Sequence, residues 1–123
     1  MKKLIALFAL IGITLTLLYA AEPAKAPQLS KAGHWKAYDA ALKKGLPKTA
    51  ITHLDPIIKL TLAQKQYDEA IKAIGKKISL EGNIQGNKPQ EKIRRLEAEI
   101  AKAPKEMVPV MDAILANWYW HYF

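Results

Sequence analysis

Apolar residues recur every three or four positions through two adjacent stretches in the middle of the chain, which predicts two amphipathic helices. The first helix is expected from Pro47 to about Ala63 and the second from Tyr67 to about Leu80. The polar run Gln64–Gln66 between them is short, which favours antiparallel neighbours. The two apolar faces consist of Ala50, Ile51, Leu54, Ile57, Ile58 and Leu62 in the first helix, and Tyr67, Ala70, Ile71, Ile74 and Ile78 in the second.

Pro56 lies inside the first of these helices. It has no N–H to donate and its ring crowds the preceding turn, at a cost of about 3 kcal/mol in a helix interior. We expect a kink there, with two shorter helices as the alternative. The apolar face runs through the proline unchanged, which favours the kink.

A shorter helix is expected before this hairpin. Ser30 is a candidate N-cap, and Trp35, Tyr38 and Leu42 lie on one face of the helix that follows. Gly45 suits the left-handed position at its end, and Pro47 suits the first turn of the next helix.

Two helices are expected after the hairpin. The glycine-containing run 81–88 is interpreted as a loop, and Asn87 as the N-cap of a helix that begins near Pro89. Pro104 ends that helix because the residue before a proline avoids helical angles. The last helix should begin near Glu106. The apolar seams of these two helices are Ile93, Leu96, Ile100 and Ala103, then Val108, Met111, Leu115, Trp118 and Tyr122.

The first 21 residues have the pattern of a secretory signal, with Lys2 and Lys3 before an uncharged, mostly apolar run from Leu4 to Leu18. A membrane anchor retained after export is the alternative. Residues 22–30 contain Pro23 and Pro27 and no periodicity, which predicts a flexible tether. Residues 31–123 are then one all-α domain, a small bundle of antiparallel helical hairpins with about five helices.

Composition narrows the possible chemistry. The chain contains no cysteine, which excludes disulfides, thiolate metal sites and a thiol nucleophile. Its net charge is +8, but the lysines and arginines are scattered and the aromatic residues fall on apolar seams. Nucleic-acid binding would require basic residues on one face with aromatic residues between them. We therefore expect no nucleic-acid partner.

No catalytic, cofactor or metal site is predicted. His34, His53 and His121 lie far apart in the sequence, without the spacing of a metal-ligand pair on one helix. Asp68 and Glu69 are adjacent, which indicates a solvated first turn near a helix N-terminus and not an acid–base pair. No phosphate-binding loop, zinc-protease motif or serine elbow is present.

The chain ends in a run of aromatic residues with no capping glycine and no polar tail. A helix that is apolar on every side needs cover from another element. The sequence therefore predicts either a partner over this end or a natural chain that continues beyond it. The predicted interaction surface is Trp118, Tyr119, Trp120, Tyr122 and Phe123.

The segment from Gln66 to Ile78 has the pattern of one helix of a tetratricopeptide-type repeat. An array would need the pattern again about 34 residues further on. It is not there, so a generic helical hairpin is the better interpretation.

Four runs of residues resemble the N-terminal helical region of large bacterial alpha-2-macroglobulin-like proteins. They read KGLPKTAI (44–51), QYDEAIKAI (66–74), EIAKAP (99–104) and ILANWYWHYF (114–123). The resemblance implies the leading segment of an exported protease-trapping protein, followed in the family by β-sandwich domains and often a Cys-x-Glu-Gln thioester motif. This chain has no cysteine, β-rich region or bait segment, so no functional residue is carried over.

These observations predict a non-enzymatic helical packing module of the periplasm or cell envelope. Its partner would be a protein, either the downstream domains of a macroglobulin-like chain or another envelope protein. Contact with a membrane is expected only through an uncleaved signal segment. The alternative is a free-standing periplasmic binding or scaffold protein that resembles a helical repeat.

Overall fold

The computed structural model describes residues 28–122, and within them it contains helices and no strand. The signal segment, most of the tether and Phe123 lie outside the described residues. The all-α prediction is confirmed for the part that is described. The helices are α2 (Lys31–Lys43), α3 (Pro47–Ala63), α4 (Tyr67–Ile84), α5 (Pro89–Lys102) and α6 (Val108–Tyr122).

The first three turns share one hydrogen-bonding scheme. In each, a backbone N–H reaches the carbonyl five residues earlier: Leu46 to Ala41, Gln66 to Thr61 and Asn87 to Gly82, at 2.7–2.9 Å. The residue before each donor has a left-handed backbone, with φ of +68° at Gly45, +55° at Lys65 and +91° at Gly86. This bond satisfies a carbonyl that the end of the helix leaves free. The chain therefore reverses the same way three times.

Helix α3 continues through Pro56 as one element, so the alternative of two shorter helices is wrong. Three of its four buried residues, Ala50, Leu54 and Ile57, belong to the predicted face, and Thr61 is the fourth. The other members of that face, Ile51, Ile58 and Leu62, are partly buried. Thr61 is tolerated in the core because its hydroxyl donates to the carbonyl of Ile57 at 2.8 Å. Among residues 28–122, no buried side-chain nitrogen or oxygen is left without a hydrogen-bond partner.

The predicted loop at 81–88 is wrong over its first half. Helix α4 runs to Ile84, and Gly82 is buried inside it. A Cβ atom at Gly82 would lie 2.3 Å from Cε of Lys92, so the glycine lets the Lys92 side chain of α5 pass close to α4. Asn87 has a φ of +52° and belongs to the turn, whereas Lys88 is the N-cap residue of α5. The predicted Asn87 cap is therefore wrong.

The helix ends predicted from Ser30 and Pro104 agree with the structure. The Ser30 side chain accepts a hydrogen bond from the backbone N–H of Gly33 at 3.0 Å, which confirms it as the N-cap of α2. Helix α5 ends at Lys102, two residues before Pro104. Helix α6 begins at Val108, slightly later than predicted, with Pro109 in its first turn.

Helix α4 is shared by two hydrophobic clusters. One cluster joins α4 to α5 and α6 and contains Ala70, Ile71, Ile74, Ile78, Leu96, Met107 and Met111. The other joins α4 to α2 and α3 and contains Tyr38, Ala41, Ala50, Leu54, Ile57 and Ala73. The core is therefore built in two halves that meet at α4.

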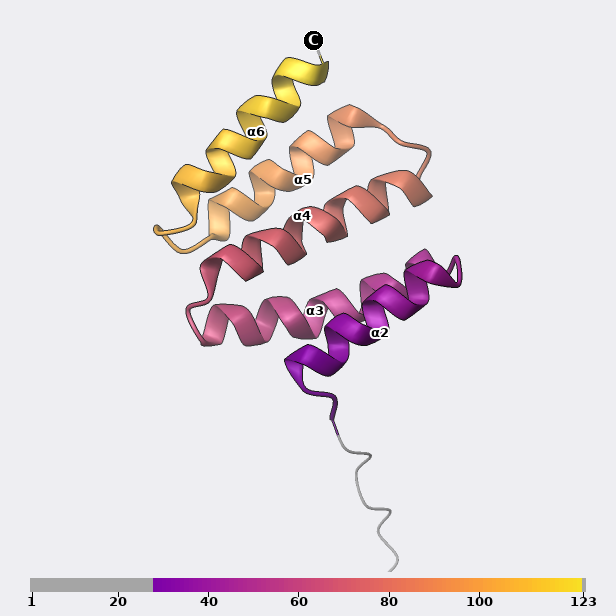
Figure 1. Cartoon of the computed structure of the whole chain (residues 1–123). Coiled ribbons are helices and arrows are strands. Elements are labelled where there is room, and N and C mark those ends of the chain that lie inside the picture. The colour runs from indigo at the N-terminus through magenta and orange to yellow at the C-terminus, as the bar shows by residue number, and fades with distance from the viewer. Residues whose placement is uncertain (1–27, 123) are drawn as a thin grey trace, which may run out of the picture.

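Each helix packs on its neighbour in the chain, and Figure 1 shows the stack running from α2 to α6 with α4 in the middle. The helices also alternate about α4, with α3 and α5 toward one side of it and α2 and α6 toward the other. Residues of α3 and α5 line one hollow together with α4, and residues of α2 and α6 line another hollow with α4. Helices stacked in sequence, each contacting mainly its neighbours, are the arrangement of helical-repeat proteins.

Candidate interaction surface

Helix α6 is the outermost helix of the stack, and the structure divides its predicted aromatic surface into two parts. Trp118 is half-buried and packs against the cluster around Met107 and Met111. Trp120 points away from the stack and is 83% exposed. Phe123 lies outside the described residues.

The two tyrosines of this surface contact α5. The Tyr119 hydroxyl donates to the Glu97 carboxylate, and this hydrogen bond raises the pKa of Tyr119. The Tyr122 hydroxyl accepts a hydrogen bond from the side-chain amide of Gln90. Both tyrosines therefore help to fix α6 on α5, and Trp120 is the described aromatic residue most open to a partner.

Trp120 belongs to a wider surface of small and apolar residues that we call the α6 outer face, with the exposed Asp112 at its edge. Its residues are all exposed and lie on the side of α6 opposite the buried Met111. They are Pro109, Val110, Ala113, Ala116, Asn117 and Trp120. Small side chains between two bulky apolar ones allow another helix to approach closely.

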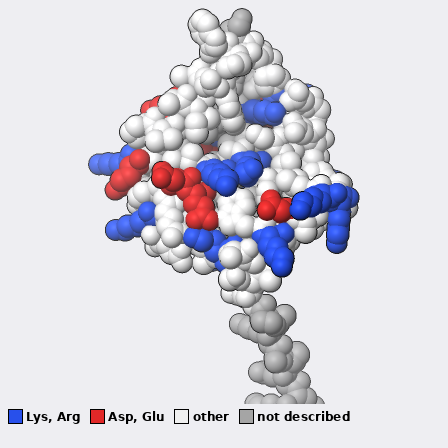
Figure 2. Space-filling model, viewed as in Figure 1, with Lys and Arg blue, Asp and Glu red and all other residues white. Residues whose placement is uncertain are grey.

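The sequence indicated the aromatic part of this surface and missed the remainder. Val110 is 49% exposed, although it stands in an apolar run that reads as a core segment. The available signal was the scarcity of charge, because Asp112 is the one Asp, Glu, Lys or Arg residue between Val108 and Tyr122. Figure 2 shows charged side chains mainly over the lower part of this view, and few around the end where α6 finishes.

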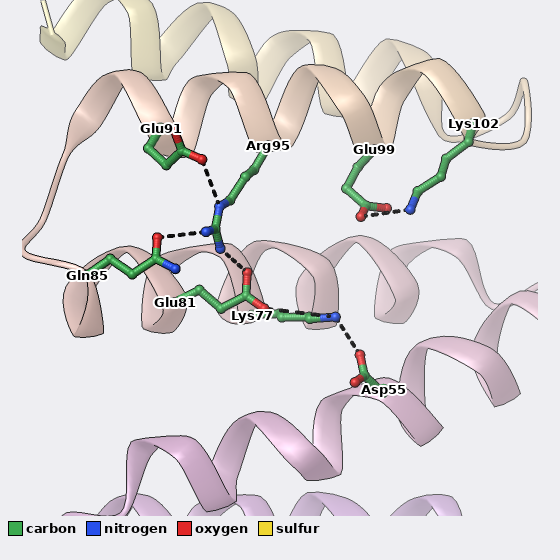
Figure 3. A network of polar contacts seen from close by, with 8 residues as sticks. All are labelled: Asp55, Lys77, Glu81, Gln85, Glu91, Arg95, Glu99 and Lys102. Atoms are coloured by element: carbon green, nitrogen blue, oxygen red, sulfur yellow. Dashed lines mark hydrogen bonds and ion pairs between the residues drawn. The ribbon is translucent and has the colours of Figure 1, made fainter.

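The hollow between α3 and α5, with α4 as its floor, is a second candidate site, which we call the α3–α5 groove. Its volume is about 600 Å³, and Ile58, Leu62 and Ile74 contribute its apolar lining. Charged side chains surround these residues, and Figure 3 shows that they pair with one another across three helices. This groove is therefore apolar below and polar at its rim.

Two basic side chains, Lys77 and Arg95, link the acidic side chains at the rim of this groove. Lys77 of α4 lies 2.6 Å from the Asp55 carboxylate of α3 and 4.0 Å from Glu81. Arg95 of α5 binds Glu81, donates to Gln85 at 2.7 Å and lies 3.5 Å from Glu91 (Figure 3). Glu91 stands one turn before Arg95 on the same helix, a spacing that favours such a pair.

Burial alone would lower the pKa of Lys77, but its bond to Asp55 and the charges of Asp55, Glu81 and Glu99 outweigh that effect and raise the pKa. The ammonium therefore stays charged and bound to its neighbours at neutral pH. The rim stabilises the packing of α3, α4 and α5, and its acidic and basic groups largely neutralise each other.

The junction of α2 and α4 contains a carboxylate that the sequence placed in solvent. Asp68 is exposed as expected, whereas Glu69 accepts hydrogen bonds from Trp35 at 2.6 Å and from Lys31 at 2.8 Å. The bond from Lys31, together with the one from Trp35, lowers the pKa of Glu69. The ammonium nitrogen of Lys72 lies 5.2 Å from the centre of the Trp35 ring. These contacts fasten α2 to the stack.

Within residues 28–122, no group of three or more His, Asp or Glu side chains could hold a metal ion. The structure does bring His34 and His53 together, although the sequence separates them. His121 lies apart from them on α6, with its Nδ1 atom 2.8 Å from the Asn117 carbonyl oxygen.

The fold and this surface define a class: a short stack of antiparallel helices whose last described helix has a mostly apolar outer face with one exposed tryptophan. Comparison of the chain with protein-family models, curated proteins and solved structures returned no match. None of the described helices combines the length and the hydropathy needed to cross a membrane.

Proposed function

We propose that this protein is a non-enzymatic packing module that docks another protein on the α6 outer face. The observation that carries this proposal is Trp120, which is 83% exposed among small and apolar residues. Tryptophan is enriched among the residues that dominate protein–protein binding energies. An exposed apolar patch of this kind often marks an interaction site.

Covering the Trp120 side chain with a partner contributes a substantial binding free energy. An aromatic side chain of this type buries about 150–250 Å² when it is fully covered. With most of that area still open, covering it contributes roughly 3–5 kcal/mol at about 25 cal/mol per Å², before the costs of association. One residue therefore supplies a large share of a micromolar affinity, which corresponds to about 8 kcal/mol.

The first candidate partner is the downstream region of a macroglobulin-like polypeptide, in an exported protein of the periplasm or cell envelope. The resemblance of the four sequence runs supports this choice. The partner would present an apolar helix or a sheet edge that accepts Trp120 between small side chains. The module would then position the protease-trapping domains and carry no reactive residue of its own.

A second candidate is a free-standing envelope scaffold that uses the groove between α3 and α5. Its apolar floor and volume of about 600 Å³ favour this function, because an extended peptide or a helix fits a hollow of that kind. The two candidates use different surfaces and are separable by mutation.

Sedimentation velocity of the chain from Glu22 to Phe123 tests the proposal. In the absence of a partner, we expect the α6 outer face to associate with itself as the concentration rises. Trp120→Lys should weaken this association about 30-fold, the factor equivalent to about 2 kcal/mol. Leu46→Lys is the matched control, because Leu46 is also an exposed apolar residue, at 46%, but lies between α2 and α3.

A chain that stays monomeric at every concentration contradicts the use of the α6 outer face. Equal weakening by Trp120→Lys and Leu46→Lys would indicate unspecific hydrophobic contact. If Leu62→Lys, in the groove, abolishes association while Trp120→Lys does not, the scaffold function replaces the first proposal.

A further inference from the structure

His34 of α2 and His53 of α3 face each other across the first helical pair. Their Nδ1 atoms are 3.2 Å apart, their ring centres are 5.5 Å apart, and their ring planes are inclined by 48°. Both residues are partly buried. Two imidazoles in this arrangement are joined by at most one N–H···N hydrogen bond, because each neutral ring carries a single proton.

The two rings stand on rigid supports. Trp35, next to His34, is held by its hydrogen bond to Glu69. Leu54, next to His53, is completely buried in the cluster that joins α2, α3 and α4. The separation between the two rings is therefore set by packed helices and not by a mobile loop.

This separation matches the spacing of two ligands on one metal ion. With metal–nitrogen bonds of about 2.0–2.1 Å and tetrahedral angles, two ligand nitrogens lie about 3.3–3.4 Å apart. Small rotations of the two rings are sufficient to direct both lone pairs at one ion.

An ion can approach the pair from the side of His34. His34 lines an open hollow of about 600 Å³, together with Gln28, Asp55 and Lys59. The hollow leaves room for water molecules in the coordination positions that the protein does not fill. The Asp55 carboxylate on its wall is bound to Lys77 at 2.6 Å, so it offers a negative charge near the site while its oxygen is already in use.

We propose that His34 and His53 bind a divalent transition-metal ion that prefers imidazole, with water completing the coordination. Imidazole suits Cu²⁺, Ni²⁺ and Zn²⁺, and affinities for such a site normally follow the order Cu²⁺ above Ni²⁺ and Zn²⁺. Mg²⁺ and Ca²⁺ prefer oxygen ligands and would not compete. The bound ion would connect α2 to α3 and make the first helical pair more stable.

The test uses the untagged full chain and CuCl₂ or ZnCl₂ alone. Isothermal titration should give saturable 1:1 binding that EDTA reverses and that 10 mM MgCl₂ leaves unchanged. The melting temperature should rise with metal concentration, because the ion binds the folded state. Electron paramagnetic resonance of the Cu²⁺ complex should resolve two equivalent nitrogen ligands.

Variants identify the ligands. His34→Ala and His53→Ala should each weaken binding at least tenfold and remove one nitrogen from the Cu²⁺ spectrum. His121→Ala is the matched control and should bind as the wild type does. His53→Gln keeps a polar side chain in place, so a loss of binding there is separable from a loss of folding judged by circular dichroism.

Absence of saturable binding by the wild type overturns the proposal, as does a His34→Ala variant that binds normally. A Cu²⁺ spectrum with one nitrogen ligand, or loss of binding in His121→Ala, would also contradict it.

Discussion

Leu96 is the most deeply buried residue of α5, and its replacement by aspartate is the most demanding test of the fold. The side chain is 2% exposed and belongs to the cluster that joins α4, α5 and α6. Ala98 is exposed on the same helix. Leu96→Asp and Ala98→Asp therefore place the same charge inside and outside the core.

The expected loss in the free energy of unfolding of Leu96→Asp has two parts. Removing a buried leucine side chain costs about 2–5 kcal/mol, the range measured for Leu→Ala changes. A carboxyl group that stays in this site at pH 7 must keep its proton against an ordinary pKa of about 3.9, which costs roughly 4 kcal/mol more. The sum is about 6–9 kcal/mol, whereas a domain of this size has about 5–15 kcal/mol in total.

We therefore expect Leu96→Asp to unfold the half of the molecule formed by α5 and α6. The other hydrophobic cluster contains no residue of α5 or α6, so α2 and α3 should keep their packing on α4. Stacked helices permit partial unfolding of this kind, because each contacts mainly its neighbours.

Nuclear magnetic resonance of the tryptophan indole N–H groups separates the two halves. The chain has three tryptophans, and the described helices place Trp35 in α2 and Trp118 in α6. The Trp118 signal should move to its unfolded position while the Trp35 signal, which reports the bond to Glu69, stays in place. Lowering the pH toward 4 should recover part of the loss in Leu96→Asp but not in Leu96→Asn.

Unchanged indole signals and an unchanged urea midpoint in Leu96→Asp would refute the position of this core. The same is true if Ala98→Asp, expected to change stability by less than about 1 kcal/mol, is as damaging as Leu96→Asp.

Two further predictions concern α2 and the glycines. Glu69→Gln should cost about 1 kcal/mol at pH 7, because solvent screens the partly exposed carboxylate. Lys31 and Trp35 lower the pKa of Glu69 in the folded state, so this contribution is present above the ordinary pKa of 4.5 and is lost as the pH falls through the lowered pKa. Urea titrations should therefore show a smaller difference from the wild type at pH 3 than at pH 7, and a constant difference would contradict the role of the charge. Gly45→Ala should destabilise the protein by about 1 kcal/mol, because φ at this position is +68°. Gly75→Ala should stabilise it by up to about 1 kcal/mol, because Gly75 lies in the interior of α4 with open space around it. Thermal unfolding of the two variants should therefore give shifts of opposite sign, and shifts of the same sign would contradict this reasoning.

The periodicity of apolar residues was sufficient to predict the helices and most of their bounds, because each helix buries one regular face. It failed at Gly82, where local propensity was outweighed by packing. A glycine costs about 1 kcal/mol in a helix. At this position it also lets Lys92 of α5 lie against α4, and Glu81 beside it binds Arg95 of α5. Contacts between helices decide such a position, and periodicity does not report them.

Contacts between helices also explain why the sequence did not reveal the histidine pair, the burial of Glu69 or the exposure of Val110. His34 and His53 are 19 positions apart, and they meet only because the turn at Gly45 folds α2 onto α3. Glu69 is half-buried because Trp35 crosses from α2 to reach it. The open side of Val110 follows from the absence of a described helix beyond α6, which no local pattern indicates.

The most direct test of the α6 outer face uses the absence of cysteine from the chain. Ala113→Cys places one spin label on this face, and Ala40→Cys places one on the exposed side of α2. At concentrations where the chain associates, dipolar coupling between labels on two copies should be strong at position 113 and weak at position 40. Association with equal coupling at both positions, or with no coupling at position 113, would contradict the central claim that the α6 outer face is a protein interface.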